Sequence, residues 1–210
     1  MAPSCPLCGN SGKLFYERPN MFHYQCETCS GIFADKKFLP ETEVERKHYT
    51  QHNNDVEDKG YQAFVSPITA AVLRDFTPKA KGLDFGAGTG PVISKVLSDK
   101  GFSIQQYDPF FHNHPHLLED KYDYIACCEV IEHFHNPGKE FALLRNLLNR
   151  NGKLYCMTHI YDESIDFPKW YYKNDPTHVF IYHRNTLSWI QKEFGFNELM
   201  IDNRLIVFSL

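Results

Sequence analysis

Short apolar runs alternate with amphipathic segments from about residue 80 to the end of the chain. Four runs have the length and apolar content of buried strands: 82–85, 102–107, 124–128 and 153–158. Between them, apolar residues recur at helical spacing after Val92 and again after Pro137, which follows the N-cap residue Asn136. This alternation predicts an α/β fold, with a mostly parallel sheet covered by helices on both faces.

The end of the chain predicts an antiparallel addition to this sheet. A helix over 185–194 is closed by Gly195, and two apolar segments follow near 197–201 and 204–209. Asp202-Asn203 forms a turn between these segments, so we expect a terminal antiparallel hairpin.

The connection after the strand at 102–107 is short. Only thirteen residues, 109–121, separate the strand that ends before Asp108 from the next strand region. This is too few for both a helix and a further strand.

Cysteine spacing sets the N-terminal residues apart. The seven cysteines include four in the pattern C-x2-C-x17-C-x2-C, formed by Cys5, Cys8, Cys26 and Cys29. Two such knuckles are typical of a tetrahedral zinc site, and we favour zinc over disulfides because no secretory signal is recognisable. Strands are predicted at 13–17 and 21–25, giving a zinc ribbon over residues 1–37 that needs its metal to fold. The three other cysteines lie in apolar runs and are expected in the core: Cys127, Cys128 and Cys156.

Charge and hydropathy exclude several classes of protein. Lys and Arg total 22 and Asp and Glu total 26, giving a net charge of −4 with no long block of either sign. No basic footprint for nucleic acid is visible, so nucleic acid is an unlikely partner. No stretch approaches the ~18 apolar residues of a membrane span, and we expect a soluble, cytoplasmic protein.

A glycine loop provides the strongest functional signal. The strand at 82–85 runs into Gly86, Gly88 and Gly90, spaced G-x-G-x-G, with Asp84 near the end of the strand. Glycine permits the tight turn from strand to helix and lets a ligand approach the backbone N–H groups. Asp108 ends the following strand, where a carboxylate can accept hydrogen bonds from both ribose hydroxyls. The pattern indicates a ribonucleoside ligand.

These residues resemble the first motif of the class I S-adenosylmethionine-dependent methyltransferases, hydrophobic-D-x-G-x-G-x-G. The resemblance extends from about Ala80 to Leu210 and implies a Rossmann-like methyltransferase domain over residues 79–210. It implies S-adenosylmethionine as cofactor. Compared with the family, the short connection over 109–121 predicts a sheet shortened around its third strand, with adenine held by a modified pocket or by Phe110 and Phe111. The implied cofactor-binding residues are Asp84, Gly86, Ala87, Gly88, Gly90, Asp108, Pro109, Cys128 and Glu129.

The segment 38–78, which connects the ribbon to this domain, has two interpretations. In class I methyltransferases the segment before the first strand often covers the cofactor and substrate, so the resemblance implies a lid. A solvated linker fits the same polar residues equally well. The segment is predicted to enter a helix at Pro40 and to contain a later helix with Phe64, Ile68, Val72 and Phe76 on its apolar face. The polar residues between these helices are His48, Tyr49, His52, Asn53, Asn54, Asp55 and Tyr61.

An acid-histidine motif follows the strand at 124–128. Glu129, Glu132 and His133 are spaced so that they converge if they share one helical turn, and they lie at the carboxyl edge of the sheet, where open α/β folds bind ligands. Two carboxylates and an imidazole suit a divalent cation such as magnesium. The same residues also suit metal-free acid/base chemistry or a structural capped helix start.

The E-x-x-E-H pattern resembles that of the ubiquinone-biosynthesis O-methyltransferases and the small-RNA 2′-O-methyltransferases. The resemblance implies a divalent metal held near the substrate by Glu129, Glu132 and His133, with His178 added from a later loop. His133 or His178 is then the candidate general base, and Glu132 belongs to the same catalytic group. The histidines His112, His114 and His116 have a spacing that also suits a metal, but we interpret them as solvated.

The favoured function is methyl transfer from S-adenosylmethionine to a small-molecule hydroxyl by in-line displacement. His159 and the aromatic residues Trp170, Tyr171 and Tyr172 are candidates for the wall of the acceptor pocket. One alternative is an RNA methyltransferase that uses the ribbon to hold its substrate. Another is a non-catalytic interaction protein that combines a zinc ribbon with a cofactor-binding domain.

Overall fold

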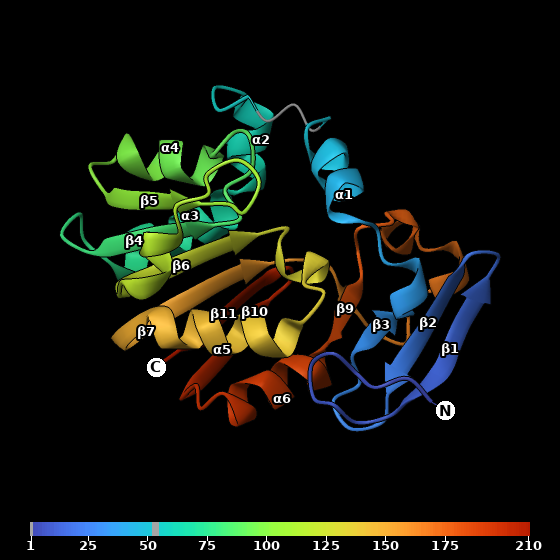
Figure 1. Cartoon of the computed structure of the whole chain (residues 1–210). Helices are drawn as coiled ribbons and strands as arrows, with labels where there is room; N and C mark the ends of the chain where they lie inside the picture. Colours follow the sequence, from blue (N-terminus) through green and yellow to red (C-terminus); the bar gives the residue numbers. More distant parts are fainter. Residues whose placement is uncertain (1, 52–54) are drawn as a thin grey trace.

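In the computed structural model, which describes residues 2–51 and 55–210, the chain forms two sheets (Figure 1). The larger sheet has the strand order β10-β11-β7-β6-β4-β5. Its strands are β4 (Lys81–Phe85), β5 (Ser103–Tyr107), β6 (Tyr122–Cys128), β7 (Leu148–Met157), β10 (Glu198–Asp202) and β11 (Leu205–Ser209). The pairs within β5-β4-β6-β7 are parallel, and β11 pairs antiparallel with both β7 and β10. The predicted parallel sheet and terminal hairpin are confirmed.

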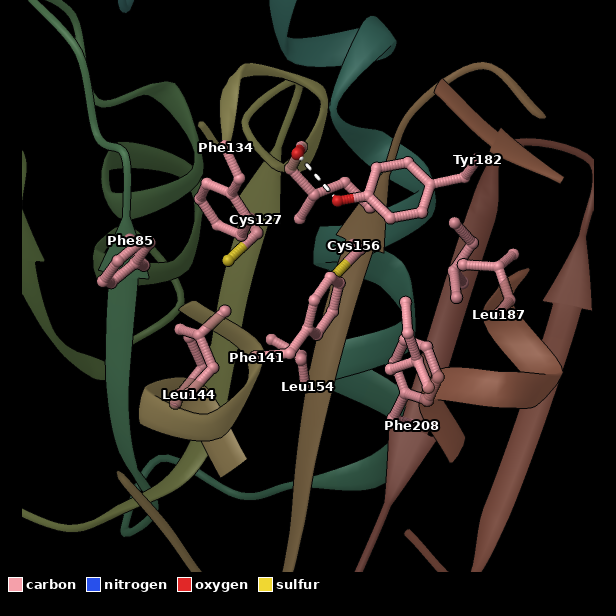
Figure 2. Packing of buried hydrophobic residues seen from close by; sticks show 14 of the residues in the cluster. Phe85, Cys127, Phe134, Phe141, Leu144, Leu154, Cys156, Tyr182, Leu187 and Phe208 are labelled. Atoms are coloured by element: carbon pink, nitrogen blue, oxygen red, sulfur yellow. Dashed lines mark hydrogen bonds between the residues drawn. The ribbon is translucent and has the colours of Figure 1, made fainter. Parts of the chain in front are cut away.

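Alternate side chains of this sheet face two separate cores. Ile125 and Cys127 pack with residues of α5 (Pro137–Leu147) and α6 (Arg184–Glu193), whereas Tyr124 and Ala126 pack with α3 (Ser66–Asp75) and α4 (Val92–Ser98). This follows from the two-residue period of a strand. Figure 2 shows the first core, in which Cys127 and Cys156 are fully buried, as the sequence predicted. Cys128 is half-buried instead.

The sheet is shortened as expected. Within the described residues no strand lies between β5 and β6, and a short 3₁₀ helix, η2 (Pro115–Glu119), occupies this connection. β5 therefore forms one edge of the larger sheet.

The smaller sheet combines segments from the two ends of the chain. Its order is β1-β2-β3-β9-β8, with β1 (Gly12–Arg18), β2 (Met21–Cys26), β3 (Ile32–Ala34), β8 (Ile160–Tyr161) and β9 (Phe180–His183). The β1–β2 hairpin agrees with the prediction. The pairing of β3 with β9 was not predicted, and it places the N-terminal ribbon beside the segment that follows β7 (Figure 1).

The connecting segment contains η1 (Lys36–Phe38), α1 (Thr42–Tyr49) and α2 (Lys59–Phe64) before α3. The predicted later helix is thus divided between α2 and α3. Asp58 caps α2 by accepting hydrogen bonds from the N–H groups of Gly60 (2.6 Å) and Tyr61 (3.2 Å). The polar residues His52, Asn53 and Asn54 lie outside the described residues. Over residues 2–51 and 55–210, no helix has the length and apolar character needed to span a membrane.

Candidate active site

The glycine loop connects β4 to α4 and has the backbone geometry that its sequence requires. Gly86 and Gly88 have φ values of +80° and +63°, in the left-handed region that favours glycine. A Cβ added to Gly86 would lie 2.4 Å from Cγ2 of Val130, so the loop also needs glycine for its close approach to the β6 end. The N–H groups of Gly86 and Ala87 donate to the carbonyl of Tyr107 at 2.8 and 3.1 Å. These bonds fix the loop to the carboxyl end of β5.

Asp84 lies buried beneath this loop, with an exposed fraction of 4%. One carboxylate oxygen, Oδ2, accepts from the backbone N–H of Ser94 at 3.2 Å and from its hydroxyl at 2.8 Å. Burial raises the pKa of Asp84 to about 6, against the lowering effect of the Ser94 bonds. A carboxylate in this setting is costly unless a ligand supplies a positive charge or further donors.

Because burial disfavours the ionised form of Asp84, the stability of the fold should depend on pH. The unfolded chain loses the Asp84 proton near pH 3.8, whereas the folded chain keeps it to about pH 6. The free energy of unfolding of the cofactor-free protein should therefore fall between pH 4 and 6, by up to about 3 kcal/mol from this group. Urea unfolding of wild type and Asp84→Asn at pH 4, 5, 6 and 7 checks this. The variant should become the more stable protein as the pH rises, and a pH-independent difference between the two proteins would contradict the prediction.

Asp108 joins the glycine loop to the loop after β5. Its Oδ2 accepts from the N–H of Gly88 at 3.0 Å, and its Oδ1 accepts from the N–H groups of Phe110 and Phe111 at 2.8 and 3.1 Å. A carboxylate has about four acceptor positions, and these bonds use three of them. Pro109 continues from this residue into the turn.

If Asp108 holds the ribose of S-adenosylmethionine, as the resemblance implies, Asp108→Ala should weaken binding of S-adenosylhomocysteine by about 100-fold, because the substitution removes the loop anchor and an acceptor for ligand hydroxyls. Isothermal titration calorimetry measures this directly. Asp99→Ala is the matched control, since the Asp99 carboxylate is exposed and pairs with Lys95 on α4. Equal affinities of Asp108→Ala and wild type would exclude Asp108 from the cofactor site.

The four N-terminal cysteines converge as the spacing predicts. Their Sγ atoms all lie within 4.8 Å of one another, with Cys5–Cys29 at 3.6 Å and Cys8–Cys26 at 3.3 Å. Tetrahedral zinc with bonds of about 2.3 Å requires sulfur atoms about 3.8 Å apart, so the cluster fits zinc. Gly9 and Ser30 directly follow the two knuckles and have φ values of +76° and +61°, which turn the chain away from the cluster.

Three side chains of the acid-histidine motif form a second cluster. Glu132 and His133 lie on the 3₁₀ helix η3 (Ile131–His133), and His178 lies just before β9. Potential ligand atoms of the three residues lie within 4.8 Å of one another. The two segments are joined by the N–H of Val179, which donates to the carbonyl of Glu132 at 3.0 Å.

Backbone carbonyls orient both imidazoles of this cluster. Nδ1 of His133 lies 2.9 Å from the Thr177 carbonyl, and Nδ1 of His178 lies 2.7 Å from the Tyr172 carbonyl. A carbonyl only accepts, so each Nδ1 carries the proton in these bonds, and Nε2 is the nitrogen without a proton in the neutral form of each ring. Burial lowers the pKa of His178, which favours the neutral ring.

Glu132 is fully buried, with one carboxylate oxygen satisfied and one not. Oε1 accepts from the Tyr172 hydroxyl at 2.6 Å, and that hydroxyl lies 2.7 Å from Oγ1 of Thr158. Oε2 has no hydrogen-bond partner among the described residues. Burial raises the pKa of Glu132, while His178 opposes this shift. One carboxylate and two imidazoles form a ligand set known for divalent metals with open positions.

The structure brings only three of the four proposed ligands into this cluster. Glu129, Glu132 and His133 do not share a helical turn, because η3 begins at Ile131 and Glu129 has a φ of +51°. The Glu129 carboxylate instead pairs with Arg204, at the turn between β10 and β11. Burial raises the pKa of Glu129 to about 7, with a further rise from Glu132 and a lowering by Arg204. Arg204 was missed by the sequence analysis because nothing in its local pattern links it to a residue 75 positions away.

The helix α1 packs against the acid-histidine cluster. The ring of Tyr49 lies 5.4 Å from that of His133 and 5.8 Å from that of Phe110. Nε2 of His48 lies 3.2 Å from Oδ2 of Asp175, three residues before His178. These contacts place the end of α1 beside the acid-histidine cluster, and both the lid and the solvated linker stay predictions for the connecting segment.

Aromatic rings extend from the cluster toward the loop after β7. The Tyr172 ring centroid lies 4.1 Å from that of His178, 4.8 Å from that of His159 and 5.1 Å from that of Trp170. Tyr171 is 65% exposed, and its hydroxyl lies 2.9 Å from Nε2 of His159. By contrast, the described residues show no convergence of the three histidines at 112, 114 and 116 into a metal-binding group.

Comparison with known proteins identifies the family. Residues 58–199 match the model of a family described as a methyltransferase domain. The chain belongs to this methyltransferase family. A search of curated proteins finds no match to this methyltransferase.

Solved structures with the same fold are S-adenosylmethionine-dependent methyltransferases. The Burkholderia thailandensis 1,6-didemethyltoxoflavin-N1-methyltransferase is 14% identical, with a TM-score of 0.57 and coverage of 94% of this chain and 97% of its own. An O-methyltransferase family protein from the same organism is 11% identical, with a TM-score of 0.53 and coverage of 82% and 60%. Human N-acetylserotonin methyltransferase is 13% identical, with a TM-score of 0.54 and coverage of 80% and 56%. The methyltransferase thus spans less than two thirds of the length of the last two, and at these identities the likeness shows the fold alone.

Proposed function

We propose that this methyltransferase transfers a methyl group from S-adenosylmethionine to a hydroxyl of a small molecule. The observation that carries the proposal is the Glu132 carboxylate, which is buried beside two oriented imidazoles with Oε2 unpaired. This cluster follows β6, whose end contacts the glycine loop through Val130 and Gly86. A methyl donor and a group that activates a hydroxyl would therefore lie side by side.

The glycine loop and its acids fit the cofactor. We assign its binding to the loop residues Gly86 to Gly90 and to Asp84, Asp108 and Pro109, with Cys128 and Glu129 at the end of β6. The cofactor supplies an electrophilic methyl group on a sulfonium. The protein's contribution is to hold the acceptor oxygen in line with that methyl and to remove the hydroxyl proton.

The cluster offers two ways to remove this proton. Nε2 of His178 or His133 accepts it directly, and the Glu132 carboxylate then stabilises the resulting imidazolium. Alternatively, Glu132, His133 and His178 would hold a divalent cation, which would lower the pKa of the hydroxyl. The unpaired Oε2 of Glu132 supports the cation, and the two nitrogen ligands suit a transition metal such as iron better than magnesium.

The small-molecule acceptor class is supported by the fold relatives and by the aromatic wall. The 1,6-didemethyltoxoflavin-N1-methyltransferase and the N-acetylserotonin methyltransferase described above carry small-molecule substrates in their names. In this chain, the half-buried rings of His159 and Trp170 pack on the buried Tyr172 and suit a planar acceptor.

A Mn²⁺ titration followed by electron paramagnetic resonance distinguishes the two modes. The zinc-loaded protein should bind one Mn²⁺, and His178→Ala should lose this binding. If wild type binds no Mn²⁺ and methyl transfer still requires His178, the metal mode is excluded and the direct acid/base mode remains. Calorimetric titration with S-adenosylmethionine tests the donor itself, and absence of saturable binding would overturn the proposed function.

A further inference from the structure

Basic side chains gather where the tip of the β1–β2 hairpin meets the 3₁₀ helix η5 (Tyr171–Asn174). Arg18 ends β1, His23 lies in β2, and Lys173 lies in η5. We propose that these three side chains, together with Asn174, form an oxyanion-binding site for a phosphoryl or carboxyl group. We call them the basic cluster.

Lys173 is the most unusual member, because it is 2% exposed and has no carboxylate partner within ion-pair distance among the described residues. Its Nζ donates to the Trp170 carbonyl at 3.3 Å and to Oδ1 of Asn174 at 3.2 Å, and it lies 5.2 Å from the Tyr16 ring centroid. Asp166, which favours the charged form of Lys173, is itself paired with Lys169 at 2.8 Å. A buried ammonium without a counter-charge is costly, so a bound anion would stabilise it.

Arg18 brings a second cation to the same acceptor. Its Nη1 donates to Oδ1 of Asn174 at 2.9 Å, and no carboxylate of the described residues pairs with it. One amide oxygen therefore serves both Arg18 and Lys173. Further donors remain on the guanidinium, on the ammonium and on Nδ2 of Asn174, enough to surround an oxyanion.

His23 supplies an independent observation. Its side chain is 1% exposed, and in the described parts of the chain neither Nδ1 nor Nε2 has a hydrogen-bond partner. The rings of Tyr16 and Phe167 flank it at 6.2 and 5.4 Å. Burial lowers its pKa to about 4, with Arg18 and Lys173 adding to the effect, so its ring is neutral and retains one N–H to donate. An imidazole left unpaired at this depth indicates a missing polar partner.

The chemistry of the basic cluster favours an oxyanion over other ligands. Every unused polar group on Arg18 and Lys173 is a donor, and a guanidinium matches the geometry of a phosphate or carboxylate. The net charge of the whole chain is −4, so this local excess of positive charge is not a consequence of overall composition. The oxyanion has two sources to distinguish: a group carried by the methyl acceptor, or a free anion. The first is considered because η5 also carries Tyr172, whose hydroxyl donates to Glu132.

Phosphate binding tests the basic cluster without any methyl transfer, so its failure is separate from failure of the proposed function. Inorganic phosphate should bind wild type saturably in calorimetry or ³¹P NMR, and Arg18→Gln and Lys173→Met should each weaken binding about tenfold or more. Lys169→Met is the matched control, because its side chain is 85% exposed in the same segment, and it should bind phosphate like wild type. If Lys173→Met fails to fold, Arg18→Gln, at the hairpin tip, still decides the question.

Two further measurements identify the source of the oxyanion. Acetate in place of phosphate compares a carboxylate with a phosphoryl group. Inorganic phosphate is also added to a methyl-transfer assay. Inhibition that is competitive with the acceptor means that the basic cluster binds an oxyanion of the acceptor, whereas an unchanged transfer rate means that it binds a free anion. No saturable phosphate or acetate binding below about 10 mM, or equal affinity of wild type and Arg18→Gln, would overturn the proposal.

Discussion

Replacing Cys29 by serine should abolish both zinc binding and methyl transfer. Backbone hydrogen bonds join the N-terminal sheet segment that carries the four-cysteine cluster to the acid-histidine cluster: the N–H of Ala34 on β3 donates to the Val179 carbonyl at 2.9 Å, and the N–H of Val179 donates to the Glu132 carbonyl at 3.0 Å. Loss of a structural zinc removes binding energy on the order of 10 kcal/mol from a ribbon too small to fold alone. We expect more than 100-fold loss of transfer.

The test of Cys29→Ser uses one preparation. Its zinc content is measured by mass spectrometry, and its thermal unfolding and its rate of methyl transfer are then compared with wild type. Cys156→Ala is the matched control, since Cys156 is a fully buried thiol of the larger sheet outside the cysteine cluster, and it should keep its zinc and most of its activity. Cofactor affinity of Cys29→Ser should change less than the transfer rate, because the glycine loop is anchored to β5 and α4. Full activity in a zinc-free Cys29→Ser protein would show that the ribbon does not support the active site.

Glu132→Gln should lower the rate of methyl transfer by about 100-fold to 1,000-fold while leaving cofactor affinity within about threefold. Glutamine keeps the size of the side chain and an oxygen for the Tyr172 hydroxyl, but it removes the negative charge that stabilises an imidazolium or a cation. The glycine loop contacts Val130 at Gly86 rather than Glu132, so the geometry of the loop should be preserved.

The measurement is a single-turnover rate at saturating S-adenosylmethionine, with cofactor affinity determined by calorimetry. Glu193→Gln, an exposed acid at the end of α6, is the control and should behave as wild type. A Glu132→Gln protein with wild-type rate and unchanged metal response would mean that the buried carboxylate serves only packing.

The sequence predicted the parts of this fold that are long or chemically constrained. The buried strands and amphipathic helices of the larger sheet follow from periodicity, and the loop was predicted from its spaced glycines, of which Gly86 and Gly88 have positive φ values. The four-cysteine cluster also followed from spacing, since each knuckle is a local turn. These signals reside within one element or between neighbouring elements.

The remaining features depend on contacts between distant segments. β3 and β9 have only three and four residues, too few for a periodic pattern, so their pairing was not predictable. The expected convergence of Glu129 with Glu132 failed for a similar reason, because Arg204 and a backbone turn at Glu129 decide where that side chain lies. The basic cluster likewise forms only when the hairpin tip and η5 meet.

The central claim is tested most directly by methyl transfer from labelled S-adenosylmethionine into a fractionated cell extract. The claim predicts label in the small-molecule fraction with wild type and Glu193→Gln, and at least 100-fold less with Glu132→Gln. Label found only in nuclease-sensitive RNA, or saturable cofactor binding with no labelled product in any fraction, would contradict it.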